Sequence, residues 1–196
     1  MGEPRGRAGA HGREGAIRRR WDPDDERNVI ILLNGPLGIG KSTLAEALME
    51  EMDECVMLDG DHVVAMNPPP PNEAEYLHDT LSLLIQHHRD RGYHNFVVNH
   101  IWRTPEEIAD LRDKLSDIDA DIRCFLLVLS LEENLRRIQV RQSARALDER
   151  DFERRTVMEE RDTLFEGTKE GLGETFDVSA SPEELVARLL SRLRVQ

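Results

Sequence analysis

The sequence predicts an α/β fold in which a parallel sheet is covered by helices on both faces. Five short apolar runs alternate along the chain with segments of helical periodicity. The runs contain few polar residues, which is typical of parallel strands that are buried on both faces. A glycine-rich sequence, GPLGIGKST at 35–43, joins the first apolar run to the first helical segment. Ligands of such sheets bind beyond the carboxyl ends of the strands, so the residues that follow each strand are the candidates for a site.

The predicted strands can be assigned from these runs, and the helices from the segments between them. The strands are expected at 29–34, 54–58, 95–101, 122–129 and 175–178. Between them, leucine, isoleucine and valine residues recur three or four positions apart, as on the buried face of a helix. Two helices should begin at capping sequences, Thr-Pro-Glu-Glu at 104–107 and Ser-Pro-Glu-Glu at 181–184.

The length of 196 residues predicts one domain, at 27–196, with a charged lid at about 139–166. Residues 1–26 nearly lack bulky apolar side chains, so we expect them to form a disordered or loosely attached tail. No apolar run approaches the roughly 20 residues that a membrane span needs. Cys55 and Cys124 both lie in apolar runs, as buried thiols do in a reducing compartment, and we expect a cytoplasmic protein.

The acidic composition bears on the partners of the protein. The formal net charge is −13, from 39 Asp and Glu against 26 Lys and Arg. General nucleic-acid binding needs a basic face, so this balance argues against it while leaving room for a local basic site. We expect no membrane partner, and the sequence leaves open whether the protein is a monomer or a homodimer.

The sequence at 35–42 matches GxxxxGK[ST], the phosphate-binding P-loop. A strand precedes it and an amphipathic helix follows it, a context that an accidental glycine-rich turn does not require. In such a loop the backbone N–H groups surround an anion at the N-terminus of a helix. Lys41 would reach the outer phosphates of a nucleotide, and the Ser42 hydroxyl would bind Mg²⁺. The predicted nucleotide-binding residues are Gly35, Pro36, Leu37, Gly38, Ile39, Gly40, Lys41, Ser42 and Thr43.

Two carboxylates follow the second predicted strand. Asp59 and Asp61 are separated by one residue, Gly60. On an extended backbone their side chains would therefore point to the same side, and Gly60 would leave open space between them. Beside a magnesium-bound nucleotide, one carboxylate could hold the water shell of the metal, and the other could accept a proton from an attacking hydroxyl. We assign Asp59 with Ser42 to the metal and prefer Asp61 as the base, and both are catalytic candidates. The alternative is that Asp-Gly-Asp only turns the chain.

The exit of the third predicted strand is unusually polar for so apolar a strand. Asn99 and His100 could contact a substrate hydroxyl or the magnesium shell, and Arg103 could bind an anionic group. Together with Asp61 they are the predicted acceptor-binding residues. His100 could equally be a histidine whose hydrogen bonds are satisfied within the fold.

Arginines recur after the fourth predicted strand. Arg137, Arg141 and Arg145 are four residues apart and would share one face of a continuous helix. Arginine at the edge of a phosphate site can neutralise charge on the transferred phosphoryl group. We therefore count Arg137 and Arg141 as catalytic candidates, as we do Lys41 of the P-loop. The charged region that follows would form a lid that closes and excludes water. A solvated charged surface is the alternative.

Together these motifs resemble the small P-loop kinases: shikimate, gluconate and adenylylsulfate kinases, and the antibiotic phosphotransferases of the same fold. The resemblance covers about residues 28–195 and rests on GPLGIGKST, on LDGD at 58–61 and, more weakly, on RRIQVR at 136–141. It implies a three-layer P-loop NTPase fold with strand order 2-3-1-4-5, a helical lid that includes Arg137 and Arg141, and a loop at 179–182 against the adenine. The histidine-proline of gluconate kinases and an acceptor-anchoring arginine shortly after Asp61 are missing, so the acceptor of those relatives does not carry over.

The expected reaction is the ATP- and Mg²⁺-dependent transfer of the γ-phosphoryl group to a hydroxyl of a small molecule, such as a metabolite, a nucleoside or an antibiotic. The sequence does not distinguish ATP from GTP as the donor. One alternative is a polynucleotide 5′-kinase, which would need a basic channel leading to Asp61. Another is a nucleotide-dependent switch without a small-molecule acceptor, against which the Asp-Gly-Asp sequence argues.

Overall fold

A computed structural model describes residues 28–118, 120–141, 147–165 and 170–194. The predicted tail, Arg145 and part of the predicted lid lie outside the described residues. The strands are β1 Val29–Asn34, β2 Cys55–Asp59, β3 Asn95–His100, β4 Asp121–Val128 and β5 Glu174–Asp177. The helices are α1 Lys41–Glu51, α2 Gly60–Val63, α3 Glu73–Arg89, α4 Pro105–Lys114, α5 Leu131–Arg141, α6 Leu147–Phe165 and α7 Pro182–Arg194. Within these ranges no helix is long and apolar enough to cross a membrane.

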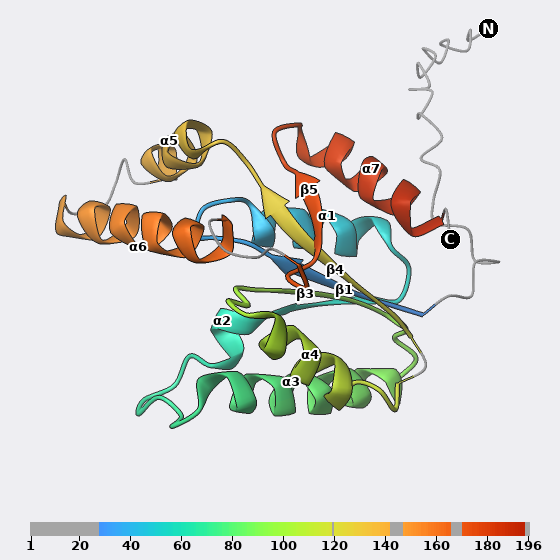
Figure 1. The fold of residues 1–196 in the computed structure, drawn as a ribbon. Coiled ribbons are helices and arrows are strands. Elements are labelled where there is room, and N and C mark those ends of the chain that lie inside the picture. Colours follow the sequence, from blue (N-terminus) through green and yellow to red (C-terminus); the bar gives the residue numbers. More distant parts are fainter. Residues whose placement is uncertain (1–27, 119, 142–146, 166–169, 195–196) are drawn as a thin grey trace, which may run out of the picture.

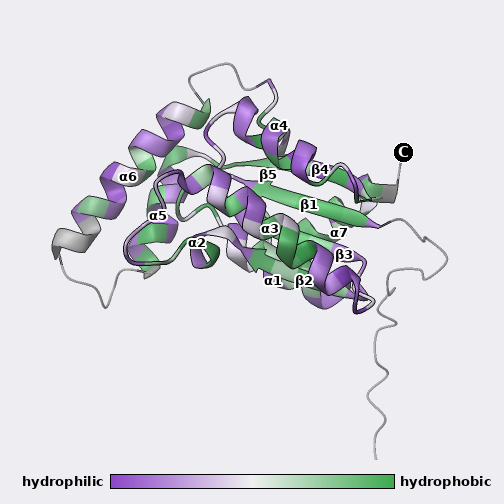
Figure 2. Cartoon of the chain, turned by 90° about the horizontal axis from the view of Figure 1, so that it is seen from below, coloured by the Kyte–Doolittle hydropathy of each residue, from purple (hydrophilic) through white to green (hydrophobic). Residues whose placement is uncertain are grey.

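The five strands form one parallel sheet in the order β2-β3-β1-β4-β5, which confirms the predicted fold (Figure 1). Helices α1 and α7 cover one face of the sheet, and α3 and α4 cover the other. Helices α5 and α6 lie beyond the carboxyl end of β4. The central strand β1 is buried along its whole length and hydrophobic, whereas α4 and α6 are mostly hydrophilic (Figure 2).

The two faces of the sheet have separate hydrophobic cores, because successive residues of a strand point to opposite sides. On β1 and β3, Ile31 and Val97 pack with α1 and α7. Their neighbours Ile30 and Val98 pack with α3 and α4. The same alternation decides toward which face each polar residue at a strand end points.

Two helices begin where the sequence predicts. The Thr104 hydroxyl accepts a hydrogen bond from the Glu107 N–H, and the Glu107 carboxylate accepts one from the Thr104 N–H, which is a complete capping box at the start of α4. Ser181 and Glu184 make the corresponding pair of bonds at the start of α7. These local bonds set where the chain leaves the sheet edge.

The expectation that Asp59 and Asp61 share one side of an extended backbone is wrong. The chain turns at Gly60 into the short helix α2, because the Asp59 carboxylate caps that helix by accepting a hydrogen bond from the Asp61 N–H at 3.0 Å. Gly60 also does not leave open space between the carboxylates. A Cβ atom there would lie 2.7 Å from Nδ1 of His100, so the missing side chain accommodates the histidine ring. The two carboxylates therefore have different partners.

Asn34, the last residue of β1, joins three segments inside the protein. Its side chain is fully buried. Nδ2 donates to the carbonyl oxygens of Trp102 at 3.0 Å and of Leu172 at 3.3 Å, and Oδ1 accepts a hydrogen bond from the Trp102 N–H at 3.0 Å. Because buried backbone groups need such partners, Asn34 fixes the segment after β3 beside the start of the P-loop.

Replacing Asn34 with Ala should lower the free energy of unfolding by about 3 kcal/mol, because buried backbone groups of Trp102 and Leu172 lose their partner. Urea denaturation followed by circular dichroism measures this change. The control is Glu46→Ala on the exposed side of α1, which should stay within about 0.5 kcal/mol of the parent protein. A loss for Asn34→Ala no larger than the control would contradict the structural role of Asn34.

Candidate functional site

Strand alternation sorts the polar residues at the sheet edge onto two faces. Asp59 is paired with Asn99 across β2 and β3, and Asn34 is paired with His100 across β1 and β3. Asn99 shares its side with Val97, which packs toward α1, whereas His100 points toward α3 and α4. The carboxyl edge of the sheet thus carries two polar residues on each face, Asp59 and Asn99 on one and Asn34 and His100 on the other. The P-loop begins at this edge, directly after Asn34.

The P-loop is held against α5 by close packing. Gly38 has a φ of +72°, a conformation that favours glycine. A Cβ atom on Gly38 would lie 2.5 Å from the Ile138 side chain of α5. The glycine at this position therefore serves both the turn of the loop and the close approach of the helix.

The Lys41 ammonium lies over the loop and among carboxylates. Its Nζ donates to the carbonyl oxygens of Gly35 at 2.7 Å and of Pro36 at 3.3 Å. Burial lowers the pKa of Lys41, and the negative charges of nearby carboxylates oppose this effect. Those carboxylates belong to Asp61, Glu160 and Asp59. A partly buried cation surrounded in this way can receive the oxygens of an outer phosphate.

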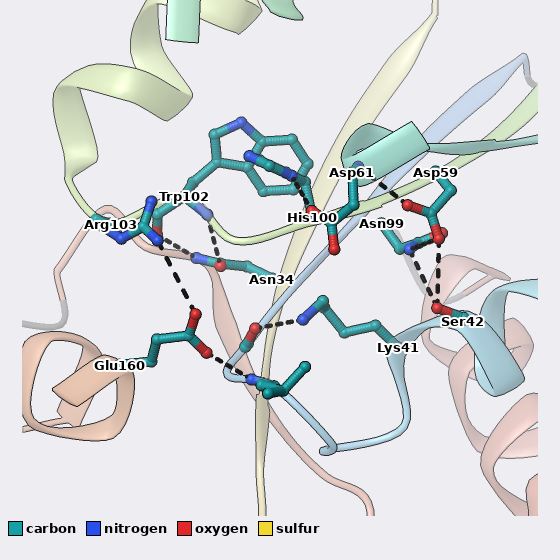
Figure 3. Close-up of polar contacts among 12 residues, drawn as sticks. Asn34, Lys41, Ser42, Asp59, Asp61, Asn99, His100, Trp102, Arg103 and Glu160 are labelled. Atoms are coloured by element: carbon teal, nitrogen blue, oxygen red, sulfur yellow. Dashed lines mark hydrogen bonds and ion pairs between the residues drawn. The ribbon is translucent and has the colours of Figure 1, made fainter. Parts of the chain in front are cut away.

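Ser42, Asp59 and Asn99 form a polar cluster on the α1 side of the edge (Figure 3). Asn99 Nδ2 donates to Asp59 Oδ2 at 2.9 Å and to Ser42 Oγ at 3.4 Å, and Ser42 Oγ donates to Asp59 Oδ2 at 3.4 Å. The buried Oδ1 of Asn99 has no hydrogen-bond partner among the described residues. A hydroxyl, a carboxylate and a free amide oxygen are ligands that suit Mg²⁺. The part of the chain that the structure describes has no group of three or more His, Cys, Asp or Glu side chains that could hold a metal, so phosphate and water oxygens would have to complete the coordination.

Asp61 and His100 form a pair on the opposite side of the edge. His100 Nδ1 lies 3.0 Å from Asp61 Oδ1. This hydrogen bond lowers the pKa of Asp61, against the effect of burial, and the charges of His100 and Lys41 add to the lowering. The Asp61 side chain is 69% exposed, so an ionised carboxylate is accessible at this point.

A polar cavity of about 260 Å³ opens next to His100, between the start of α3 and the segment that follows β3. The cavity is lined by aromatic rings and by charged side chains. They are Glu73, Ala74, Leu77, His78, His100, Ile101, Trp102, Arg103 and Glu107. Of the predicted acceptor-binding residues, His100 and Arg103 line this cavity, Asp61 bonds to its His100 wall, and Asn99 lies on the other face of the edge.

The sequence did not single out His78, which shapes this cavity. Trp102 Nε1 donates to His78 Nε2 at 3.1 Å, and His78 Nδ1 lies 2.7 Å from Asp110 Oδ2. Because an indole N–H can only donate, the neutral His78 carries its proton on Nδ1 and donates it to Asp110. His78 and Trp102 are both 1% exposed, so the hydrogen bonds from Trp102 through His78 to Asp110 fix the indole in the cavity wall. The sequence signal that could have indicated His78 is a histidine on the leucine-rich face of a predicted helix, the face expected to be buried.

Arg137 joins the P-loop to the exit of β5. Its guanidinium donates from Nη1 to the Ile39 carbonyl at 2.9 Å and from Nη2 to the Val178 carbonyl at 2.8 Å. Arg141 is the last residue of α5 and its side chain lies outside the described residues, as does Arg145. The structure thus brings one of the three predicted arginines to the P-loop.

A larger cavity, of about 470 Å³, lies beside Arg137. It is bounded by the P-loop and the start of α1, by α5, and by the segment from Val178 to Pro182. The volume is that of a typical small-ligand site. The loop at 179–182 therefore lies across from the P-loop, where the resemblance predicts a nucleotide base.

Glu160 of α6 is a further residue at the P-loop that the sequence did not reveal. Its Oε2 accepts a hydrogen bond from the Leu37 N–H at 2.6 Å, and its Oε1 lies 3.9 Å from Arg103 Nη2. The side chain is only 13% exposed. Arg103, which we predicted to bind an anion, thus already faces this carboxylate. Glu160 is one of many acidic residues in a charged helix, and no local pattern distinguishes it.

Comparisons with known proteins bear on the fold of this chain. A model of the AAA domain family matches residues 30–166. Similar solved structures include a tunicamycin resistance protein from Deinococcus radiodurans, with 17% identity and a TM-score of 0.61 over 87% of this chain and 98% of that chain. A gluconokinase from Sinorhizobium meliloti 1021 has 18% identity and a TM-score of 0.58, over 85% of this chain and 95% of that chain. The APS kinase CysC of Mycobacterium tuberculosis, in complex with AMPPNP and APS, has 18% identity and a TM-score of 0.55, over 85% of this chain and 98% of that chain.

No curated protein matches this chain. At the identities of the solved structures, the likeness shows the fold alone, and it confirms the predicted resemblance to the fold of the small P-loop kinases. The family model covers well over half of the sequence. The chain belongs to the AAA domain family of P-loop proteins.

Proposed function

We propose that this protein transfers the γ-phosphoryl group of Mg²⁺-bound ATP to a hydroxyl group of a small molecule. The observation that carries the proposal is the position of Asp61. Its carboxylate interacts with Lys41 at the P-loop and hydrogen-bonds His100 in the wall of the smaller cavity. An ionised, accessible base between a phosphate site and a cavity is the arrangement that phosphoryl transfer to a hydroxyl needs.

In this proposal the α1 side of the sheet edge binds the donor. The backbone N–H groups of 35–43 hold the phosphates, and Lys41 contacts the outer ones. Ser42 and Asp59 would hold Mg²⁺, which would neutralise charge on the phosphates. The base of the nucleotide occupies the larger cavity, against Arg137 and the loop at 179–182. Arg137 therefore positions the P-loop and the base rather than reaching the transferred group.

The acceptor occupies the smaller cavity, on the α3 side. Asp61 accepts the proton of the attacking hydroxyl, and His100 keeps Asp61 ionised and oriented. The charged groups of the cavity are two carboxylates, Glu73 and Glu107, and one guanidinium, that of Arg103, which faces Glu160. This balance favours acceptors that are neutral or cationic over acceptors that carry carboxylate, sulfate or phosphate groups.

The direct test mixes purified protein with Mg²⁺ and ATP and with a panel of hydroxylated metabolites, nucleosides and antibiotics grouped by net charge. We expect ADP release that depends on an acceptor, a phosphorylated product by mass spectrometry, and no turnover by Lys41→Ala. Hydrolysis that no acceptor changes would favour a nucleotide-dependent switch instead. Oligonucleotide binding that falls steeply with salt would favour a polynucleotide kinase.

Asp61→Asn should lower the turnover rate at least about a hundredfold without weakening the binding of ATP, because the variant lacks the base but keeps the P-loop. Steady-state kinetics and calorimetry measure the two effects separately. Asp113→Asn, on the exposed side of α4, is the matched control and should keep full activity. An Asp61→Asn enzyme with near-normal turnover would exclude Asp61 as the base.

His100→Phe should raise the pKa of Asp61 toward its ordinary range, because the ring remains but its hydrogen bond and charge are lost. A carboxyl ¹³C NMR titration measures this shift. A lowered pKa stabilises the folded protein above the unfolded-state pKa, and this contribution is lost as pH falls through the folded pKa. The difference in unfolding free energy between parent and variant should therefore shrink below about pH 4.

Asp177 is the internal control for this titration, because hydrogen bonds from the Ser179 hydroxyl and from the Ser179 N–H lower its pKa at a distant position. Its titration should be the same in both proteins. An unchanged Asp61 titration in His100→Phe would show that His100 does not control the ionisation of this carboxylate.

A further inference from the structure

Both backbone polar groups of Leu37, the third residue of the P-loop, are held by hydrogen bonds. One partner is Glu160 of α6, and the other is Asn134 of α5, which itself bonds to α6. The Leu37 N–H donates to Glu160 Oε2 at 2.6 Å. The Leu37 carbonyl accepts a hydrogen bond from Asn134 Nδ2 at 3.1 Å, and Asn134 Oδ1 accepts one from Arg161 Nη1 at 3.2 Å. Two adjacent residues of α6 thus fix the conformation of one P-loop residue, directly and through a fully buried asparagine.

Packing fixes the position of Glu160 in this arrangement. Its neighbour Arg161 donates from Nη2 to the Leu129 carbonyl at 3.0 Å, and its guanidinium lies 4.9 Å from the centre of the Phe165 ring. The Glu160 side chain itself is largely buried. Hydrogen bonds from an N–H to a carboxylate are stronger than those between neutral groups. The contact is therefore a built feature of the fold and not a passing approach of a surface acid.

The Glu160 carboxylate uses groups that a phosphate would use. N–H groups of a P-loop are anion ligands, and Glu160 accepts from one of them. Its charge acts on Lys41, and it lies 3.9 Å from the Arg103 guanidinium. Figure 3 shows the carboxylate below Arg103 and beside the P-loop. An amide and two cations thus already face a fixed negative charge.

The inner and outer phosphates of a nucleotide meet this charge to different degrees. The inner phosphates bind the N–H groups at the start of α1, whereas the outermost one extends along Lys41 toward the acceptor. We propose that Glu160 competes with the terminal phosphate for the Leu37 N–H and so sets the preference of the protein between triphosphate and diphosphate. When the terminal phosphate takes this N–H, Glu160 moves aside and Arg103 is released toward the acceptor cavity. This inference rests on the proposed function.

The variant Glu160→Gln tests the inference, because the amide keeps the size of the side chain and can still accept a hydrogen bond from Leu37. Removing the like charge should tighten binding of a non-hydrolysable ATP analogue about tenfold and change the affinity for ADP less than about twofold. Isothermal titration calorimetry with Mg²⁺ measures both constants. Glu159→Gln is the matched control, because it removes the same charge from the exposed neighbouring residue; both affinities should stay within about twofold.

Thermal unfolding of the parent protein and both variants verifies that each is folded before binding is compared. Equal changes for the two nucleotides, no change, or weaker binding of the ATP analogue by Glu160→Gln would overturn the inference. If the parent protein binds both nucleotides but the ratio of affinities does not respond to Glu160→Gln, only the role of Glu160 is wrong. If the parent protein binds neither nucleotide, the proposed function fails, and this inference fails with it.

Discussion

The buried amide of Asn34 is the interaction on which the arrangement of the site depends. It ends the central strand, directly before the P-loop, and it bonds to both backbone groups of Trp102 and to the carbonyl of Leu172. The P-loop and the wall of the smaller cavity are therefore held at a fixed separation by one side chain. A polar group buried so deeply is tolerated because both ends of its amide are satisfied.

The site itself is dominated by negative charge around the partly buried ammonium group of Lys41. Asp59, Asp61 and Glu160 all act on Lys41. A nucleotide that enters with its own phosphate charges meets this group of carboxylates, so electrostatics favour a nucleotide that arrives with its charge partly neutralised by a metal. The acidity of the whole chain, with a net charge of −13, has the same sign. Under the proposed function, the acidic protein would rely on local N–H groups and on bound cations, rather than on a basic surface, to hold a phosphorylated ligand.

Much of the fold could be predicted because its signals are local. Apolar runs gave the strands, glycines and Lys41 gave the P-loop, and Thr104 gave the start of α4. The missing side chain of Gly60 makes room for the ring of His100, forty residues later, and this contact could not be predicted from local pattern. Glu160 reaches a residue 123 positions earlier in the chain. Such contacts exist only once the sheet has brought distant segments together, so no local pattern marks the residues that make them.

The division of the sheet edge into two faces also bears on how such a protein changes over evolutionary time. Asn99 and His100 are neighbours in one strand, yet one belongs to the phosphate-binding side and the other to the cavity side. Substitutions on α3 and α4 can reshape the cavity while the loop, its lysine and its serine stay as they are. An insertion of one residue within β3 would exchange the two sides and destroy both at once. Under the proposed function, new acceptors would be accessible by point mutation, whereas changes of length in this strand would not be tolerated.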